Sequence, residues 1–250
     1  TNGYTVDYDA FESAISQNDV KVFIHCNPHN PVGHVWTEEE MDRLFSICQR
    51  HNVLIISDEI HQDLITGSTP FTPALSVSNG HYADHMITMS SVSKSFNMAS
   101  LHQAEVMIPN ETLRTQYNAY KAQVYHTDAD VIAETAIAAA YTHPEAEAWL
   151  TDVLAVIRGN YDYLCNELLS VLPELRISPM DGTYLAWIDF GAYVKTEDMH
   201  DVFEHQCRIA PSFGEWFGGE SYATFVRLNL ATSLANIKIA INTIIQYIHP

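Results

Sequence analysis

The stretch His85-Met86-Ile87-Thr88-Met89-Ser90-Ser91-Val92-Ser93-Lys94 carries the signal that decides the fold. Its first five residues are mostly apolar and predict a buried strand, and three serines and a lysine follow where that strand gives way to a loop. A lysine at the end of a buried strand is unusual because an ammonium group resists leaving water. A partly desolvated amine becomes a nucleophile toward carbonyls, and the neighbouring hydroxyls can hold an anion such as a phosphate. Taken alone, the stretch favours an ordinary surface loop with a solvated lysine, and the rest of the chain reverses that interpretation.

Two further apolar runs precede this stretch, and each is followed by a polar loop. Residues 20–25 predict a strand that leads into Asn27-Pro28-His29-Asn30-Pro31-Val32-Gly33, a turn stiffened by two prolines. Residues 53–56 predict a strand that leads into Ser57-Asp58-Glu59-Ile60-His61. The second run has no polar alternation, which is typical of a strand covered on both faces in a parallel sheet.

A well-signalled helix joins the first two strands. Thr37 is its expected N-cap and Glu40 occupies the third helical position, which together make a capping box. The order strand, loop, helix, strand, loop, strand predicts an α/β layer with a mostly parallel sheet and flanking helices. Ligands bind beyond the carboxyl ends of the strands in such sheets, so the loops with Asn30, Asp58 and Lys94 are expected at one edge.

After Pro173 the sequence pattern changes to short predicted strands with helices between and after them. Helices are expected over 111–126 and 128–141, over a long stretch that opens at Pro144, and near 196–206 and 233–248. Strands are expected over 103–108, 183–190 and 225–230. We therefore predict that residues 1–165 form part of a large domain, including the start of an interdomain helix, and that residues 166–250 form a small α+β domain.

Composition narrows the class of partner. The chain has 12 basic and 31 acidic residues, a net charge of −19 and a pI near 4.8, which argues against nucleic acid or an anionic membrane as the main partner. Its four cysteines are widely spaced and form no CxxC pair, so we interpret them as reduced thiols of a cytoplasmic protein. No apolar run approaches the ~20 residues of a membrane span.

Several polar residues fit a pyridoxal-phosphate site, where Lys94 would form a Schiff base. Asp58 can pair with a pyridinium nitrogen, although aspartate also favours helix N-caps. Asn30 can donate to the phenolic oxygen of the cofactor, with an Asx-type turn as the alternative. His61 can do the same from the other side, or it is an ordinary loop histidine. Arg227 stands in an apolar strand and can bind a substrate carboxylate, or it forms a structural ion pair.

A metal site is a rival interpretation that the sequence disfavours. His25, Cys26, His29 and His34 have a spacing that resembles metal ligands. Two prolines stiffen the turn between them, however, and a strand would point the first two side chains to opposite faces. We therefore expect no metal, and no nucleotide cofactor either, because the chain has no glycine-rich phosphate-loop pattern.

Four motifs in this order resemble those of the fold-type I pyridoxal-phosphate enzymes. They are Asn27-Pro28-His29-Asn30-Pro31-Val32-Gly33, Ser57-Asp58-Glu59-Ile60-His61, Ser91-Val92-Ser93-Lys94-Ser95-Phe96-Asn97 and Phe225-Val226-Arg227-Leu228-Asn229. The phrases around Cys26 and Asp58, together with Gly182-Thr183-Tyr184-Leu185-Ala186-Trp187, look like the MalY/PatB-type cystathionine β-lyases of the aminotransferase class I/II superfamily. The resemblance spans nearly the whole sequence.

The resemblance implies roles for residues of these motifs. It makes Lys94 the residue that binds the cofactor covalently and then acts as a general base at Cα of the substrate. It makes Asp58 the partner of the pyridine nitrogen, with Asn30 and His61 flanking the phenolic oxygen. It also assigns Ser91 and Ser93 to the cofactor phosphate, and Arg227 to the substrate carboxylate.

The sequence departs from the family pattern in two places and lacks one part of it. Ser100 stands where relatives commonly have glycine, and His102 stands where many aminotransferases have a phosphate-binding arginine. Family members also carry an N-terminal segment with a glycine-containing phosphate loop, a stacking aromatic residue and strands of the main sheet. Glycine makes up 10 of the 250 residues, or 4%, whereas the average share in proteins is about 7%. We therefore expect a partial fold-type I domain, which is either a fragment or a chain that needs a separate N-terminal segment of the same enzyme.

The function that the resemblance implies is a β-elimination. We expect a cytoplasmic, homodimeric lyase that uses pyridoxal 5′-phosphate to convert L-cystathionine or a related cysteine S-conjugate into a thiol, pyruvate and ammonia. The alternatives are an aminotransferase with the same cofactor and an inactive fragment that only binds a partner. If the 250 residues act alone, we expect weak cofactor binding and little lyase activity.

Overall fold

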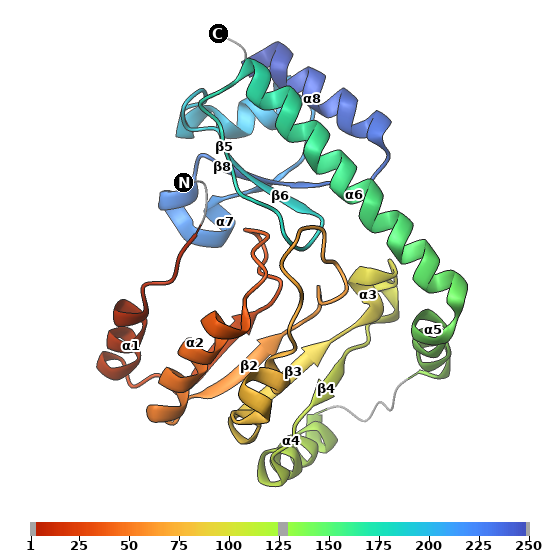
Figure 1. Ribbon diagram of the computed structural model, residues 1–250. Coiled ribbons are helices and arrows are strands. Elements are labelled where there is room, and N and C mark those ends of the chain that lie inside the picture. Colours follow the sequence, from red (N-terminus) through yellow and green to blue (C-terminus); the bar gives the residue numbers. More distant parts are fainter. Residues whose placement is uncertain (1–3, 125–129, 249–250) are drawn as a thin grey trace.

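The computed structural model describes residues 4–124 and 130–248. The α-helices are α1 (Tyr8–Gln17), α2 (Glu38–Arg50), α3 (Val92–Ser95), α4 (Glu111–Val124), α5 (Val131–Thr142), α6 (Pro144–Val171), α7 (Glu215–Gly218) and α8 (Leu234–Ile248). The strands are β1 (Val22–Cys26), β2 (Leu54–Asp58), β3 (Met86–Ser90), β4 (Glu105–Met107), β5 (Arg176–Ile177), β6 (Leu185–Asp189), β7 (Ser212–Phe213) and β8 (Phe225–Asn229). They form two separate sheets, one below the other in Figure 1.

The first sheet has the strand order β1-β2-β3-β4, as expected for a mostly parallel layer. β1, β2 and β3 run parallel, whereas β4 pairs antiparallel with β3 at the edge. The pairing places Cys26, Asp58 and Met89 side by side where the parallel strands end. The loops that follow β1, β2 and β3 therefore leave from the same edge and face the second sheet (Figure 1).

Helix α2 covers one face of this sheet. Thr37 caps it through its side chain and the Glu40 carboxylate accepts the Thr37 N–H, so the predicted capping box is confirmed. The apolar stripe of α2 is inaccessible to water and packs against the sheet. Phe45 lies fully inside this core, so replacing it with alanine is expected to cost about 3–5 kcal/mol.

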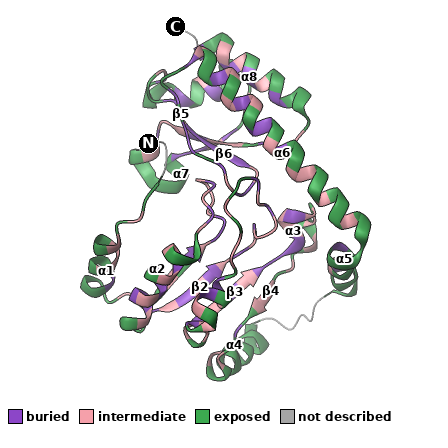
Figure 2. Cartoon of the chain, viewed as in Figure 1, coloured by how far each residue is buried: buried purple, intermediate pink, exposed green. Residues whose placement is uncertain are grey.

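The opposite face of the first sheet is only partly covered by the described residues. The register aligns Ile24, Ile56 and Ile87 across three strands. Ile24, on the edge strand, is 69% exposed. Figure 2 shows buried and intermediate residues alternating along β2 and β3, and the largely exposed helix α4 beside them. Apolar rows of this kind are a liability for aggregation when they stay in water.

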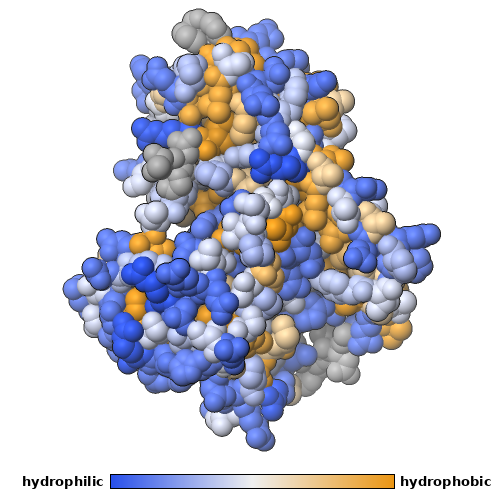
Figure 3. Space-filling view, viewed as in Figure 1, coloured by the Kyte–Doolittle hydropathy of each residue, from blue (hydrophilic) through white to orange (hydrophobic). Residues whose placement is uncertain are grey.

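The second sheet has the order β5-β6-β8-β7 and is antiparallel throughout. Helices α6 and α8 pack on it and supply one wall of its core, which includes Ile157 and Leu164 of α6. The 28 residues of α6 run from α5 beside the first sheet to this second core (Figure 1). Figure 3 shows hydrophobic surface along α6. Val156 of this helix is 51% exposed. The domain boundary after residue 165 stays a prediction.

Backbone hydrogen bonds join the two halves at the turn that follows β1. The Gly33 carbonyl accepts the N–H groups of Asp181 and Gly182, each at 3.0 Å. A Cβ atom on Gly182 would lie 2.6 Å from the Pro28 ring, so this close approach requires glycine. The second domain is thereby fixed directly above the loop that carries Asn30.

One local prediction was wrong, and one helix has a different type of hydrogen bonding from the one expected. The loop expected around Lys94 contains the short helix α3, because the Ser91 side chain accepts the Ser93 N–H and starts a helical turn. The helix expected near 196–206 is present, as a 3₁₀ turn over Thr196–Asp198 that continues through Met199 and His200 into the π-helical segment Asp201–Gln206. The predicted helices 111–126 and 128–141 correspond to α4 and α5, with residues 125–129 outside the described part.

No helix within the described residues is long and apolar enough to cross a membrane.

Candidate active site

A cavity of about 450 Å³ lies between the first sheet and the second domain. Four of the predicted site residues line it together, namely Asn30, His61, Lys94 and Arg227. They come from the loop after β1, the loop after β2, helix α3 and strand β8. The remaining wall is largely apolar and comes from the second domain, including α8. The cavity therefore has a cationic, hydrogen-bonding end near the sheet and an apolar end near α8.

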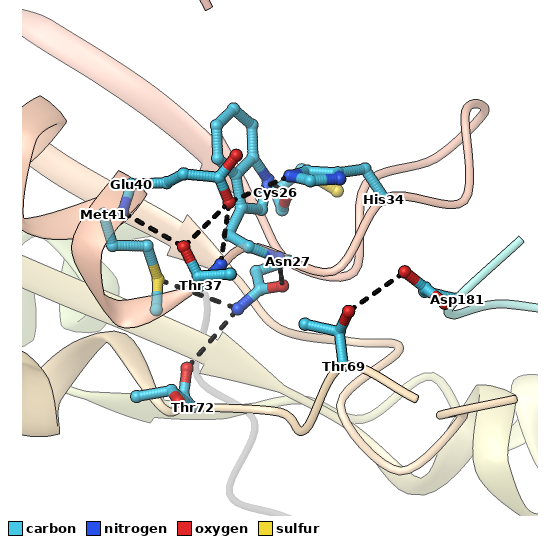
Figure 4. Close-up of polar contacts among 10 residues, drawn as sticks. Cys26, Asn27, His34, Thr37, Glu40, Met41, Thr69, Thr72 and Asp181 are labelled. Carbon is cyan, nitrogen blue, oxygen red and sulfur yellow. Dashed lines mark hydrogen bonds and ion pairs between the residues drawn. The ribbon is translucent and has the colours of Figure 1, made fainter. Parts of the chain in front are cut away.

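The turn after β1 holds Asn30 in place through the side chain of Asn27, which is completely buried. Its amide nitrogen donates to the Thr72 carbonyl at 3.4 Å, and its amide oxygen accepts the Trp36 N–H at 3.1 Å (Figure 4). The same view shows Thr69 donating to Asp181, which ties the loop after β2 to the second domain. Asn30 is thus carried by a fixed turn rather than by a free loop.

Arg227 extends from β8 to Asn30. One guanidinium nitrogen donates to Asn30 Oδ1 at 2.8 Å and the other donates to Ser212 Oγ at 2.9 Å. The guanidinium carbon also lies 4.8 Å from the centre of the Phe217 ring. Desolvation lowers the pKa of this partly buried guanidinium, and nearby Tyr184 works in the other direction. Among the described residues Arg227 forms no ion pair, so the structural ion pair considered for it is absent there.

His61 is buried on the wall of the same cavity, with 4% of its surface exposed. Its Nδ1 atom has no hydrogen-bond partner among the described residues. Burial, together with the positive charges of Lys94 and Arg227, lowers the pKa of His61 to about 4. His61 is therefore neutral near pH 7 and offers one unpaired ring nitrogen, which a ligand in the cavity can satisfy.

Lys94 lines two cavities, the one already described and a second of about 520 Å³ on the side of α6. Ser93 lines only the second. Ser91 lies at the start of α3, where its hydroxyl donates to the Gln103 carbonyl at 2.6 Å. The structure therefore brings Lys94 to the site, whereas it uses the Ser91 hydroxyl to cap α3.

Asp58 lies at the end of β2, outside the residues that line the main cavity. One of its carboxylate oxygens accepts the Ile60 N–H at 3.1 Å. Strand alternation puts its side chain on the face of Ile56, which α2 does not cover. Its place at the carboxyl edge of the parallel sheet is compatible with a ligand on that side.

Three residues at the site were not singled out from the sequence. Tyr184 lines both cavities with Lys94 and packs edge-to-face on His61, with ring centres 5.9 Å apart. Ser212 and Phe217 hold the Arg227 guanidinium. Tyr184 stood inside a quoted motif and could have been proposed, whereas no local pattern marks Ser212 or Phe217.

The histidines considered as metal ligands have other surroundings. His25 is buried beneath the site, and its Nδ1 lies 3.1 Å from Ser57 Oγ, which donates to Glu59 at 3.0 Å. Burial lowers the pKa of His25 to about 3 and raises the pKa of Glu59. His34 contacts Glu40. No group of three or more possible metal ligands gathers within the described part of the chain.

Comparison with known proteins adds a family to this geometry. The sequence model of the family "Aminotransferase class I and II" matches residues 1–244. The cystathionine beta-lyase PatB of Bacillus subtilis is 32% identical over 238 residues, which cover 94% of this chain but only 60% of PatB. This chain therefore spans about three fifths of the length of that relative.

Solved structures give the same result. A PLP-bound putative aminotransferase from Clostridium difficile superposes with a TM-score of 0.92 at 32% identity and covers 99% of this chain and 62% of its own. A PLP-bound C-S lyase from Staphylococcus hominis gives a TM-score of 0.90 at 30% identity, with the same two shares. The mixed α/β fold predicted from the sequence is confirmed by these likenesses.

Proposed function

Because the chain belongs to the aminotransferase class I and II family, we propose that it forms most of a pyridoxal-phosphate-dependent carbon–sulfur β-lyase. The proposed substrate is L-cystathionine or a related cysteine S-conjugate, and the products are a thiol, pyruvate and ammonia. The observation that carries the proposal is that Lys94, His61, Asn30 and Arg227 line one cavity. The similarity to PatB and to the Staphylococcus hominis C-S lyase supports the lyase activity.

The residues present fit the cofactor. His61, on the cavity wall, has a buried ring nitrogen without a hydrogen-bond partner among the described residues. Lys94 lines the same cavity and forms no ion pair with a carboxylate among those residues. We assign Lys94 to the aldehyde carbon, Asp58 to the pyridine nitrogen and His61 and Asn30 to the phenolic oxygen. The phosphate is assigned to Ser93, which lines the second cavity beside Lys94, whereas the role predicted for Ser91 is not proposed again because its hydroxyl donates to the Gln103 carbonyl. When bound, pyridoxal phosphate supplies an electron sink for negative charge that develops at Cα of an amino acid.

The residues of this chain then supply orientation and proton transfer. Arg227 binds the substrate carboxylate through guanidinium N–H groups that Asn30 and Ser212 leave free. The Lys94 amine removes the proton from Cα as the general base. The electron pair left at Cα would form a Cα–Cβ double bond as the Cβ–S bond breaks and the sulfur leaves with its electrons as a thiolate, and water would hydrolyse the resulting enamine to pyruvate and ammonia. Asp58 would accept a hydrogen bond from the pyridine nitrogen and so hold the proton there.

We propose a cytoplasmic homodimer, in keeping with the acidic composition and four unpaired cysteines. We also propose that further polypeptide of the same enzyme covers the row formed by Ile24, Ile56 and Ile87. The support is that Ile24 is exposed and Ile56 and Ile87 are half-buried, together with the greater length of the relatives. The same segment would supply the phosphate loop and the stacking aromatic residue that this sequence lacks.

The test is to incubate the intact protein, loaded with cofactor, with L-cystathionine. Pyruvate and a free thiol formed without any added keto acid are the expected result. Strict dependence on a keto acid would favour an aminotransferase, the second candidate, which the likeness to the Clostridium difficile protein supports. If a folded sample gains no visible absorbance with pyridoxal phosphate, the protein does not use this cofactor and binding to a partner becomes the better proposal.

A further inference from the structure

The segment that carries Lys94 is too short to fix its own orientation. Helix α3 has four residues, Val92–Ser95, so a single turn of backbone hydrogen bonds holds it. At its start, the Ser91 hydroxyl donates to the Gln103 carbonyl at 2.6 Å. What holds its other end decides where the lysine side chain can reach.

Asp63 holds that other end. The hydroxyl of Ser95, the residue after Lys94, is buried and donates to Asp63 Oδ2 at 2.7 Å. The hydroxyl of Tyr141, near the end of α5, donates to the same oxygen at 2.9 Å. Burial raises the pKa of Tyr141 to about 12, and the Asp63 charge acts in the same direction. The tyrosine therefore remains a donor at any physiological pH.

This carboxylate also belongs to the segment that carries the other site residues. Asp63 follows His61 by two residues, and the Leu64 N–H donates to the His61 carbonyl at 2.9 Å, so the turn between them is closed. Phe96, just beyond α3, reinforces the contact by packing edge-to-face on Tyr141 at 5.8 Å. The three side chains thus link the loop after β2, helix α3 and helix α5 at one carboxylate oxygen.

We propose that Asp63, with Ser95 and Tyr141, is a positioning residue that holds the Lys94 amine at the distance from His61 needed to bond to the cofactor aldehyde. The inference rests on the proposed function, because it concerns the lysine assigned to that bond. Asp63 acts through hydrogen bonding and not through its charge on the ammonium, since no ion pair between Asp63 and Lys94 occurs among the described residues.

The experiment separates positioning of Lys94 from general damage to the pocket. The intact protein is exposed to pyridoxal phosphate, the lysine bond is trapped with borohydride at several times, and peptide mapping gives the rate of labelling at Lys94. Affinity for pyridoxamine 5′-phosphate, which has no aldehyde, is measured in parallel. Asp63→Ala is expected to slow labelling about tenfold, with pyridoxamine phosphate affinity within about twofold of the wild type.

Two further variants and one control complete the test. Asp63→Asn keeps an oxygen that can accept both hydroxyls, so it is expected to recover labelling to within about threefold of the wild type. Ser95→Ala is expected to behave like a milder Asp63→Ala, whereas Ser170→Ala removes an exposed helix hydroxyl and serves as the matched control.

Three results would overturn the inference. Equal labelling rates in Asp63→Ala and the wild type would do so, as would a parallel loss of pyridoxamine phosphate affinity, which would mean a purely structural role. A defect in Asp63→Asn as large as that in Asp63→Ala would show that the charge matters instead. If the wild type itself gives no adduct at Lys94, the proposed function fails and this inference fails with it.

Discussion

Replacing Arg227 with alanine is predicted to weaken substrate binding by a factor that the geometry allows us to work out. A guanidinium has five N–H donors, and two of them are engaged, with Asn30 at 2.8 Å and Ser212 at 2.9 Å. The remaining donors can give a carboxylate two hydrogen bonds, each worth about 1.5–3 kcal/mol when the partner is charged. Loss of both costs about 3–6 kcal/mol, so the dissociation constant should rise at least ~100-fold.

The assay compares an amino acid with its decarboxylated amine. Both are titrated into the cofactor-loaded wild type and into Arg227→Ala, and binding is followed through the visible absorbance of the cofactor. The wild type should prefer the amino acid by the factor given above, and the variant should lose that preference. Equal affinity for the two ligands in the wild type would refute the assigned role.

A matched variant controls for loss of structure, because Arg227→Ala also removes the contact with Phe217 and leaves Asn30 Oδ1 without its donor. Arg227→Lys keeps the positive charge but not the planar fork, and it should recover only part of the affinity. Thermal unfolding of both variants shows how much of the effect comes from the fold.

The remaining predictions address other parts of the chain. Lys94→Ala should abolish borohydride-trapped cofactor and pyruvate formation, and a trapped label on a different lysine in the wild type would contradict the assignment. Asp58→Asn should lower kcat about 100-fold and change KM much less, because the pyridine nitrogen partner matters once charge develops at Cα; steady-state kinetics decide, and an effect confined to KM would count against it. His25 has a folded pKa of about 3 against about 6.5 unfolded, so the unfolded chain takes up a proton first as the pH falls. The contribution of His25 to the free energy of unfolding should therefore drop by about 1.4 kcal/mol per pH unit between about pH 6 and 4, and His25→Phe should reduce the slope measured in urea titrations by about that amount, leaving the part that comes from other buried groups such as His61. Ile24→Lys should reduce light scattering by the 250-residue chain expressed alone, since this edge residue is 69% exposed; unchanged scattering would mean that the row is not what aggregates.

Local sequence patterns were enough to predict the strands and the polar groups that follow them. Three apolar runs, each followed by a polar segment that carries Asn30, Asp58 or Lys94, predicted the parallel layer. The carboxyl ends of parallel strands share one edge, so these polar segments were expected together. The capping box could also be predicted locally, because Thr37 and Glu40 are only three residues apart.

Local sequence patterns did not predict whether a short polar segment is helical. The serine-rich stretch at Lys94 has the composition of a loop, yet it forms a helical turn that Ser91 caps locally and that contacts with Gln103 and Asp63 hold at both ends. Those partners lie 12 and 32 residues away. Propensity acts over one turn, whereas such contacts depend on how distant elements pack.

By itself, the sequence determined that this protein has a mostly parallel α/β layer followed by a smaller α+β unit, and which side chains have the chemistry of a pyridoxal-phosphate site. Only the tertiary structure decided which of those side chains meet. It joined Arg227 to Asn30 across 197 residues and recruited Ser212 and Phe217 as supports. It left Asp58 off the main cavity wall and made Asp63 the link between the lysine helix and α5. The physical reason is that spacing along the chain fixes periodicity and caps, while meeting across domains is set by sheet register, helix packing and close approaches such as that of Gly182 to Pro28.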